Sequence, residues 1–209
     1  MQILFLMADG FEETEFVTPF DYLQRAGFEV ALASVSGKAE VTGLRGLRIQ
    51  TDFALSGADT AAFDGVLLPG GGIGVKNLKA SAEVEKVIHE FNDKGKWIFA
   101  ICAAPLVLSK AGILAGKTAT CFPGCESELV CKKFVEDRVV VDGHVVTSRG
   151  AGTAEEFAFE CIAQLGGREL TEKIRKQVVA REIAVNLQNV RASASVTGGL
   201  PWRIRRGAL

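Results

Sequence analysis

The chain alternates apolar runs of strand length with stretches whose apolar residues recur at helical spacing. Gln2 to Met7 is a near-continuous apolar run, and the stretch after it carries its large apolar residues on one side, as a helix does. Phe28 to Val35 and residues 65–68 supply two more apolar strands, and Ser81 caps a helix that reaches about Asn92. The chain therefore begins as an alternation of strands and helices.

The second half continues the alternation and adds a hairpin. Trp97 to Ile101 is a buried strand, and a helix-forming run from Ala103 to Lys110 follows, with Cys102 between the two. Two short valine-rich runs flank Asp142-Gly143, a turn pair that predicts an antiparallel hairpin. Strand, helix and hairpin therefore succeed one another up to about residue 150.

Two helices are predicted near the end of this pattern, and the whole points to an α/β fold. Thr153 with Glu156 three residues later is typical of a capping box that opens a helix to about Leu165, and a last helix is expected over residues 170–184. Alternating strands and helices predict a mostly parallel sheet with helices on both faces. Right-handed crossovers would bring the loops after the strands to one edge, where open α/β sheets bind ligands.

Composition argues for one domain. The chain has 209 residues, 48% of them hydrophobic, and a net charge of −1, so a core can form without disulfide or metal staples. Residues 186–209 hold four arginines and no acid, whereas residues 1–185 hold 20 basic and 25 acidic side chains. We expect a single domain over 1–185 and a basic C-terminal tail over 186–209, for which disorder is one interpretation. The acidic body argues against nucleic acid as a partner.

The chain starts without the basic and apolar regions of a signal peptide and has no apolar run of about 18 residues. Neither export nor a membrane span is therefore expected. Its five cysteines, an odd number, are not needed as a disulfide framework. We predict a cytoplasmic protein with reduced thiols.

Cys102 is the most informative candidate for chemistry. A residue between a buried strand and a helix must turn sharply, and the small Ala103 and Ala104 let the backbone approach it, as in a nucleophile elbow. Unpaired N–H groups and the positive end of the helix dipole would favour the thiolate and lower the pKa of the thiol. The alternative is that Cys102 is a small buried hydrophobe at the end of a strand.

Two other segments follow predicted strands and are therefore expected at the same edge of the sheet as Cys102. Gly71, in a run of three glycines, could bind an oxyanion through its backbone N–H together with that of Ala103, although a turn that needs positive φ also explains the glycines. After the first strand come the three acids of residues 12–15. They suit a helix dipole, yet one carboxyl could point at the thiol, and burial would then raise the pKa of that carboxyl.

The other titratable residues argue against familiar alternatives. Neither His89 nor His144 is well placed to activate Cys102, which makes a papain-like pair improbable. The cysteines at 121, 125 and 131 have no histidine with them and fit no zinc spacing, so no metal site is expected. Cys121, at a strand end, is a candidate secondary redox thiol, and Cys161 is most simply part of the core.

Four segments follow one another in a recognisable order: Glu12-Glu13-Thr14-Glu15, Leu68-Pro69-Gly70-Gly71, Ala100-Ile101-Cys102-Ala103-Ala104-Pro105 and Thr147-Ser148-Arg149-Gly150-Ala151-Gly152-Thr153. They resemble the successive motifs of the ThiJ/PfpI superfamily, in the branch of the parkinsonism-associated protein deglycase and its bacterial relatives annotated for thiazole biosynthesis. The resemblance covers about residues 1–180. It implies a flavodoxin-like three-layer sandwich, similar to class I glutamine amidotransferases, and usually a homodimer.

The resemblance also implies roles for individual residues. Cys102 matches the reactive, oxidation-prone cysteine, and Glu15 matches the acid that hydrogen-bonds its thiol, so both are candidate catalytic residues. Gly71 and Ala103 match the backbone donors beside the thiol, and Arg45 matches an arginine near the partner's site.

Departures from the family pattern narrow the chemistry. Phe122 stands where the parkinsonism-associated protein has a histidine, which puts any mechanism using that histidine as a base in doubt. We place Phe122 with Gly70 and Arg45 among the candidate substrate or partner residues. Ala103 replaces the histidine of the protease branch, which disfavours peptidase activity.

The resemblance implies a cofactor-independent enzyme of the glyoxalase or deglycase type, acting on small aldehydes or glycated adducts and linked to oxidative-stress protection. Cys102 would add to the aldehyde while Glu15 moves the proton. The alternative is a non-enzymatic redox sensor or chaperone in which Cys102 is oxidised to sulfenate and sulfinate. A role in thiazole monophosphate synthesis rests only on the names of relatives. A second copy of the chain is the expected protein partner, and no membrane partner is expected.

Overall fold

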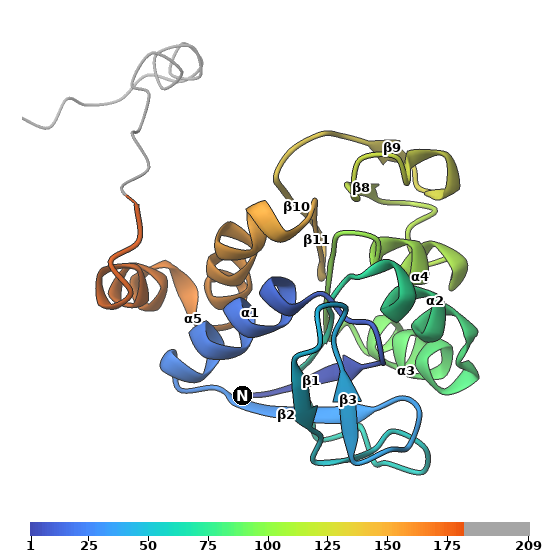
Figure 1. Ribbon diagram of the computed structural model, residues 1–209. Helices are drawn as coiled ribbons and strands as arrows, with labels where there is room; N and C mark the ends of the chain where they lie inside the picture. The colour runs from blue at the N-terminus through green and yellow to red at the C-terminus, as the bar shows by residue number, and fades with distance from the viewer. Residues whose placement is uncertain (182–209) are drawn as a thin grey trace, which may run out of the picture. The chain divides into compact units, whose positions relative to one another are not determined.

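The computed structural model describes residues 1–181, and the predicted basic tail at 186–209 lies outside these residues. Residues Met1–Val178 form one compact unit around a seven-stranded sheet (Figure 1). The strands of this sheet are β1 (Gln2–Met7), β2 (Glu29–Ser34), β5 (Phe53–Ala54), β6 (Gly65–Leu68), β7 (Trp97–Ile101), β10 (Val139–Asp142) and β11 (Val145–Ser148). Across the sheet they lie in the order β10-β11-β7-β6-β1-β2-β5.

All neighbouring strands of the sheet are parallel except β10 and β11, which pair antiparallel. The predicted hairpin is confirmed, and its turn is Gly143-His144, with Gly143 at φ +64, because Asp142 already pairs with Val145. The central strands are buried on both faces because residues 3–6 of β1 and 66–68 of β6 are fully inaccessible. This explains why their sequences are continuous apolar runs.

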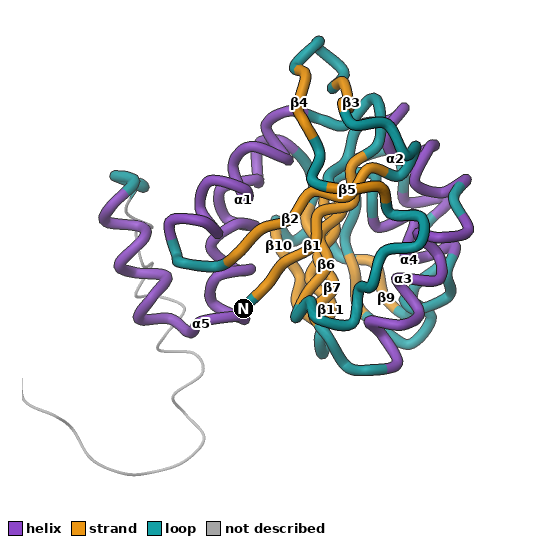
Figure 2. The backbone as a smooth tube through the Cα atoms, turned by 90° about the horizontal axis from the view of Figure 1, so that it is seen from below, coloured by secondary structure: helices purple, strands orange, loops and turns teal. Residues whose placement is uncertain are grey.

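Helices cover both faces of the sheet. Helices α1 (Glu13–Arg25) and α5 (Ala154–Gln177) pack together on one face, while α2 (Gly72–Ala80), α3 (Ala82–Asp93) and α4 (Pro105–Lys110) cover the other (Figure 2). The predicted three-layer α/β architecture with a mostly parallel sheet is confirmed. Among the helices within residues 1–181, none is both long enough and apolar enough to cross a membrane.

The two helices predicted at the end of this pattern are present, with different bounds. Helix α5 spans Ala154–Gln177, but Gly167, with φ +85 and ψ +168, is non-helical and separates a first helix from a second one that ends at Gln177 instead of residue 184. The predicted capping box does not form, because the hydroxyl of Thr153 bonds Ser148 and the backbone of Gly150 instead. The carboxylate of Glu156 binds Arg138 at 2.8 Å.

Several short elements carry too few residues for a periodic pattern and were not predicted. They are the hairpin of β3 (Glu40–Thr42) and β4 (Arg48–Gln50), the pair β8 (Thr118–Ala119) and β9 (Lys133–Phe134), and the 3₁₀ turns Glu126–Glu128 and Ala151–Thr153. Helix α2 was also missed, since two of its first three residues are glycines with low helix propensity. Packing against α3 and α4 supports it.

Candidate active site

The candidate site lies where neighbouring strands send their connections to opposite faces of the sheet. Strand β1 continues through α1 on one face, whereas β6 continues through α2 and α3 on the other. A crevice therefore opens between the carboxyl ends of these strands, which is where ligands bind in sheets of this kind. Three segments converge there: the first turn of α1, the glycines after β6, and the turn after β7.

Cys102 occupies that last turn in a conformation that L-residues rarely adopt. Its φ is +68, in the left-handed region, which costs on the order of 1 kcal/mol for a residue other than glycine. Two backbone hydrogen bonds hold the turn: the Cys102 N–H donates to the Ser148 carbonyl at 2.9 Å, and the Phe122 N–H donates to the Cys102 carbonyl at 2.7 Å. The strained turn keeps the thiol, in a side chain only 8% exposed, at the start of the loop leading to α4.

Glu15 is the acid of the first turn of α1 that faces the thiol. It hydrogen-bonds the Cys102 thiol, and its Oε2 accepts the Gly70 N–H at 3.0 Å. The backbone N–H of Ala151 also donates to this carboxyl. The side chain is 1% exposed, so these partners take the place of water around its oxygens.

The other two acids of the motif have structural roles. Glu12 caps α1, because its Oε2 accepts the Glu15 N–H at 2.8 Å. Glu13 accepts the backbone N–H of Arg45 at 2.5 Å and so fixes the turn between β3 and β4 to the start of α1. The three carboxyls therefore have different roles: Glu12 caps the helix, Glu13 anchors the turn between β3 and β4, and Glu15 bonds the thiol.

Burial sets the protonation of the Glu15–Cys102 pair. Burial, together with the negative charge of Glu12, raises the pKa of Glu15 to about 7, although hydrogen bonds from Cys102 and Gly70 act in the opposite direction. Burial and the neighbouring Glu15 carboxylate also raise the pKa of the Cys102 thiol. The expected lowering of the thiol pKa is thus wrong for this geometry: desolvation and the carboxylate outweigh the backbone donors. Near neutral pH, the carboxylate of Glu15 is therefore the group of this pair that can accept a proton.

Two backbone N–H groups face the sulfur. Those of Gly71 and Ala103 hydrogen-bond the Cys102 sulfur and favour its ionised form. Glycine is required at both positions after β6: Gly71 has φ +97, and a Cβ on Gly70 would lie within 2.5 Å of the Cys102 Cβ and would collide with the Glu15 carboxylate. The predicted backbone donors therefore lie against the thiol itself.

The remaining predicted residues lie at different distances from this centre. The backbone of Phe122 bonds the Cys102 turn. Its ring is 45% exposed and lies beside Gly150, 3.2 Å from the position that a Cβ on Gly150 would take. Arg45 is 70% exposed and pairs with Glu12 at 3.2 Å within its own chain, so in this chain it reaches the cap residue and not the thiol.

The other thiols lack comparable surroundings. Cys121 is fully buried, and burial with its negative neighbours raises its pKa to about 12, which gives no support to a secondary redox role. Cys125 and Cys131 are half-buried beside it, and burial raises the pKa of both. Within residues 1–181 no group of three or more histidine, cysteine or acidic side chains is arranged to hold a metal ion.

His144 lies at the opposite end of the sheet from Cys102. His144 precedes β11, next to the start of β7, whereas Cys102 follows the end of β7. His144 lies in the turn between β10 and β11, where its half-buried ring bonds Asn92 at 3.2 Å and burial lowers its pKa. The residue that sequence reasoning missed is Ala151, whose N–H reaches Glu15 from a distant loop.

Comparison with known proteins places the chain among relatives of one family. The sequence pattern of the DJ-1/PfpI family matches residues 1–164. The chain is 39% identical to Protein dj-1beta of Drosophila melanogaster over 175 residues, which cover 83% of this chain and 94% of that protein. It is 31% identical to Deglycase PH1704 of Pyrococcus horikoshii over 151 residues, covering 71% and 90% of the two chains. The solved structure of oxidised Toxoplasma gondii DJ-1 superposes with a TM-score of 0.83 at 34% identity and covers 87% of this chain and 99% of that one.

Proposed function

The chain belongs to the DJ-1/PfpI family, and we propose that it is a cysteine-dependent, cofactor-independent enzyme of the glyoxalase or deglycase type. The substrate would be a small 2-oxoaldehyde or the adduct that such an aldehyde forms on an amine or thiol. The observation that carries the proposal is the buried Glu15–Cys102 pair with two backbone N–H groups on the sulfur. The name of the Pyrococcus relative supports the class of reaction.

The first step would be addition of the Cys102 sulfur to the aldehyde carbon. The carboxylate of Glu15 takes the proton of the thiol, since its pKa of about 7 makes it a base near neutral pH. The N–H groups of Gly71 and Ala103 stabilise the thiolate as it forms. The proton then passes to the aldehyde oxygen, which yields a neutral hemithioacetal and restores the carboxylate.

The second step would rearrange that adduct. Glu15 removes the proton from the former aldehyde carbon and returns one to the neighbouring carbon, while the hydroxyl proton of the adduct passes to the ketone oxygen, so the ketone becomes an alcohol and the first carbon becomes a thioester. Water then hydrolyses the thioester, releasing lactate from methylglyoxal and regenerating the thiol. No external oxidant or reductant is needed, because oxidation of one carbon balances reduction of the other. Phe122, in place of a histidine, leaves Glu15 as the proton carrier.

Lactate release from methylglyoxal tests the enzyme directly. We expect the wild-type protein to form lactate and Cys102→Ala to lose at least about 99% of the rate, because addition needs the sulfur. Cys161→Ala is the matched control, since this thiol lies in α5 away from the crevice, and it should retain the wild-type rate. Equal rates for wild type and Cys102→Ala would contradict the proposal.

A redox-sensing chaperone is the second candidate. The same N–H groups that favour the thiolate would stabilise a sulfenate or sulfinate on Cys102, and the Toxoplasma neighbour was solved in an oxidised form. Mild peroxide should then oxidise Cys102 before the four other thiols, as peptide mass spectrometry would show. Uniform oxidation of all five would count against this role. The third possibility, thiazole monophosphate synthesis, finds no support in the described residues.

We further propose that the protein is a cytoplasmic homodimer. Apolar side chains are exposed where a second copy could cover them: Val17 on α1 and Leu44 and Leu47 at the turn between β3 and β4 are each at least 40% accessible. That turn is fixed to α1 by the Leu44 N–H, which donates to the Phe11 carbonyl at 2.9 Å. Light scattering should give twice the chain mass of 22.3 kDa; a species of 22.3 kDa alone would contradict the dimer.

A further inference from the structure

A second cavity lies at the same edge of the sheet but on the other side of the loop that follows β1. Its volume is about 560 Å³, within the range of small-molecule sites. It is lined by residues from the ends of β1 and β2, from α2 and from the first turn of α3: Ala8, Asp9, Val35, Ser36, Asn77, Ala80, Ser81, Ala82 and Glu83. Its lining includes neither Cys102 nor Glu15, and no role in the reaction above involves it.

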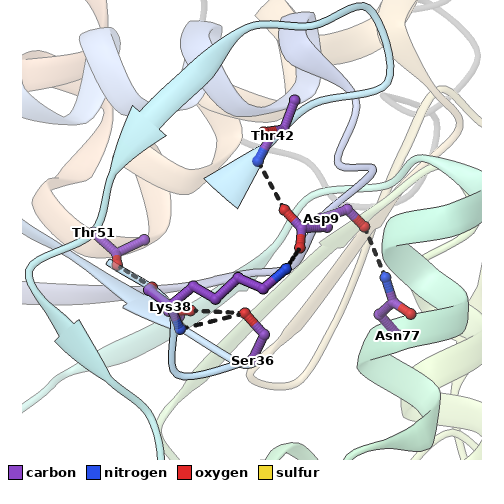
Figure 3. A network of polar contacts seen from close by, with 7 residues as sticks. Asp9, Ser36, Lys38, Thr42, Thr51 and Asn77 are labelled. Atoms are coloured by element: carbon purple, nitrogen blue, oxygen red, sulfur yellow. Dashed lines mark hydrogen bonds and ion pairs between the residues drawn. The ribbon is translucent and has the colours of Figure 1, made fainter. Parts of the chain in front are cut away.

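Polar side chains converge on Asp9 at the wall of this cavity (Figure 3). The Asp9 carboxylate accepts the Thr42 N–H at 2.9 Å and the Lys38 ammonium at 3.1 Å, while the Asn77 amide donates to the Asp9 carbonyl at 2.8 Å. The hydroxyl of Ser36 lies beside the base of Lys38, whose backbone N–H it accepts at 3.5 Å. The hydrogen bond from Thr42 and the pairing with Lys38 lower the pKa of Asp9, so this wall stays ionised at neutral pH.

These groups keep further hydrogen-bonding capacity. Lys38 has three N–H donors and gives one to Asp9. The amide NH₂ of Asn77 bonds Asp9, and its Oδ1 is a further acceptor. On the opposite side, the Glu83 carboxylate accepts the Ser81 hydroxyl at 3.1 Å and has further lone pairs. The cavity thus presents donors and acceptors together, between small apolar walls of alanine and valine.

The charges on the wall decide between ligand classes. Two carboxylates, Asp9 and Glu83, line the cavity, and the Lys38 ammonium, which is not among the lining groups, pairs with Asp9 alone, so an anion such as phosphate meets net repulsion. A ligand ammonium is not needed at Asp9, where Lys38 already supplies the cation. A hydroxyl suits the lining groups, because it donates to Asn77 or Glu83 and accepts from Ser36 in the same pose. The small apolar walls suit C–H groups between such hydroxyls.

We propose that this cavity binds a neutral polyhydroxylated small molecule of monosaccharide size. The carboxyl ends of β1 and β2 supply its acidic and hydroxyl walls, and α2 supplies the amide. Carboxylate and amide groups held in place by hydrogen bonds bind such a molecule with little reorganisation, and Lys38 fixes the Asp9 carboxylate. The site and the Cys102 centre are separate, since the cavity lining includes none of Glu15, Gly70, Gly71, Cys102 and Ala103.

Methyl β-D-glucoside and myo-inositol are the probes, because neither has an aldehyde that can react at Cys102. Titration of isotope-labelled full-length protein, followed by two-dimensional NMR, should shift the backbone signals of Asp9, Ser36 and Asn77. Those of Gly71 and Ala103 should not move. Binding should persist in Cys102→Ala, which separates this proposal from the proposed enzyme activity.

Two variants test the assigned groups. Lys38→Met and Asn77→Leu replace exposed side chains, so the fold should tolerate both. Each should weaken glycoside binding about tenfold, because Asn77→Leu removes an amide that lines the cavity and Lys38→Met removes the cation that holds the Asp9 carboxylate in place. Lys79→Met is the matched control, since Lys79 pairs with Glu128 at 3.2 Å much as Lys38 pairs with Asp9, but outside the cavity. It should leave the affinity unchanged.

Three results would overturn the assignment. One is the absence of shifts with either probe up to about 50 mM, well above a millimolar dissociation constant. Another is binding that Lys38→Met and Asn77→Leu weaken no more than Lys79→Met does. The third is displacement of Asp9 signals by inorganic phosphate or ethylammonium when the glycoside has no effect, which would assign the cavity to a charged ligand.

Discussion

Cys102 and Cys161 are both buried, but the regions around them differ in kind. Cys161 is fully inaccessible among the apolar residues on the inner face of α5, and burial raises its pKa well above the ordinary value. Cys102 is 8% exposed at the end of β7, where a carboxyl and two backbone N–H groups touch its sulfur. Burial raises the pKa in both regions. Only the second region also holds a base that can take the proton of the thiol.

The comparison teaches that burial alone does not make a thiol functional. In α5 the thiol fills space as a small apolar group would. At the turn after β7 the chain accepts a left-handed residue and a buried carboxyl, both of which cost stability. Locally unfavourable features of this kind, which the surrounding structure maintains, are typical of reactive sites.

The largest expected difference between the two regions is in reaction with iodoacetamide. Cys161 can react only when α5 opens, and an opening of at least about 4 kcal/mol makes its alkylation roughly a thousandfold slower than that of Cys102. Peptide mass spectrometry over a time course measures both rates in one sample. Comparable rates would mean that the surroundings of Cys102 do not expose or activate its thiol.

Next in size is the dependence of stability on pH. The pKa of Glu15 is about 7 in the folded protein against 4.5 for the ordinary group. Below pH 4.5 the carboxyl is protonated in both states; as pH rises, the unfolded chain releases the proton first. The free energy of unfolding should fall by up to about 3 kcal/mol between pH 4.5 and 7, at about 1.4 kcal/mol per pH unit.

Urea unfolding at pH 4.5 and 7.5 measures this change. Glu15→Gln removes the titrating group and should remove most of the decline, whereas Glu13→Gln, on the same turn but half-buried, should keep it. The same decline in wild type and Glu15→Gln would show that Glu15 is not the group responsible, and the contrast with the apolar surroundings of Cys161 would lose its electrostatic basis.

A third prediction concerns catalysis by the pair. Glu15→Gln should lower kcat/KM for methylglyoxal about a hundredfold, because the amide cannot accept the thiol proton. In the wild-type protein kcat/KM should rise with pH to a plateau above about 7, the pKa at which Glu15 ionises. The variant should lose that inflection. Retention of the inflection near pH 7 would assign the base to another group.

The smallest expected effect tests the space around the sulfur. Gly70→Ala places a methyl group against the Cys102 Cβ and the Glu15 carboxylate, and should lower kcat/KM about tenfold by separating the pair. Gly72→Ala is the control, because its Cβ would meet nothing within 4 Å. Circular dichroism should show both variants folded. Equal activities would indicate that the pair tolerates displacement and is less preorganised than its hydrogen bonds suggest.

Much of the fold follows from local patterns. The strand Trp97–Ile101 and the helix after Ser81 have the predicted bounds to within a residue, because buried parallel strands and N-capped helices leave continuous or periodic apolar runs. The two helices predicted over 153–165 and 170–184 are the two parts of α5, which the non-helical Gly167 separates, and the second part ends earlier than predicted, at Gln177. Elements of two or three residues, such as β5 and β8, are too short to show a periodic pattern of apolar residues.

By itself, the sequence determined the class of fold, the turn at Cys102 and the set of acids from which a partner of the thiol would come. The family resemblance pointed to Glu15 as that partner, and the tertiary structure shows its carboxyl at the sulfur. Only the tertiary structure decided that Glu12 caps the helix and that Arg45 lies against the cap. It also reversed the expected direction of the pKa of Cys102. The physical reason is that a period or a cap depends on neighbours in the chain, whereas burial and charge depend on strand ends that only folding brings together.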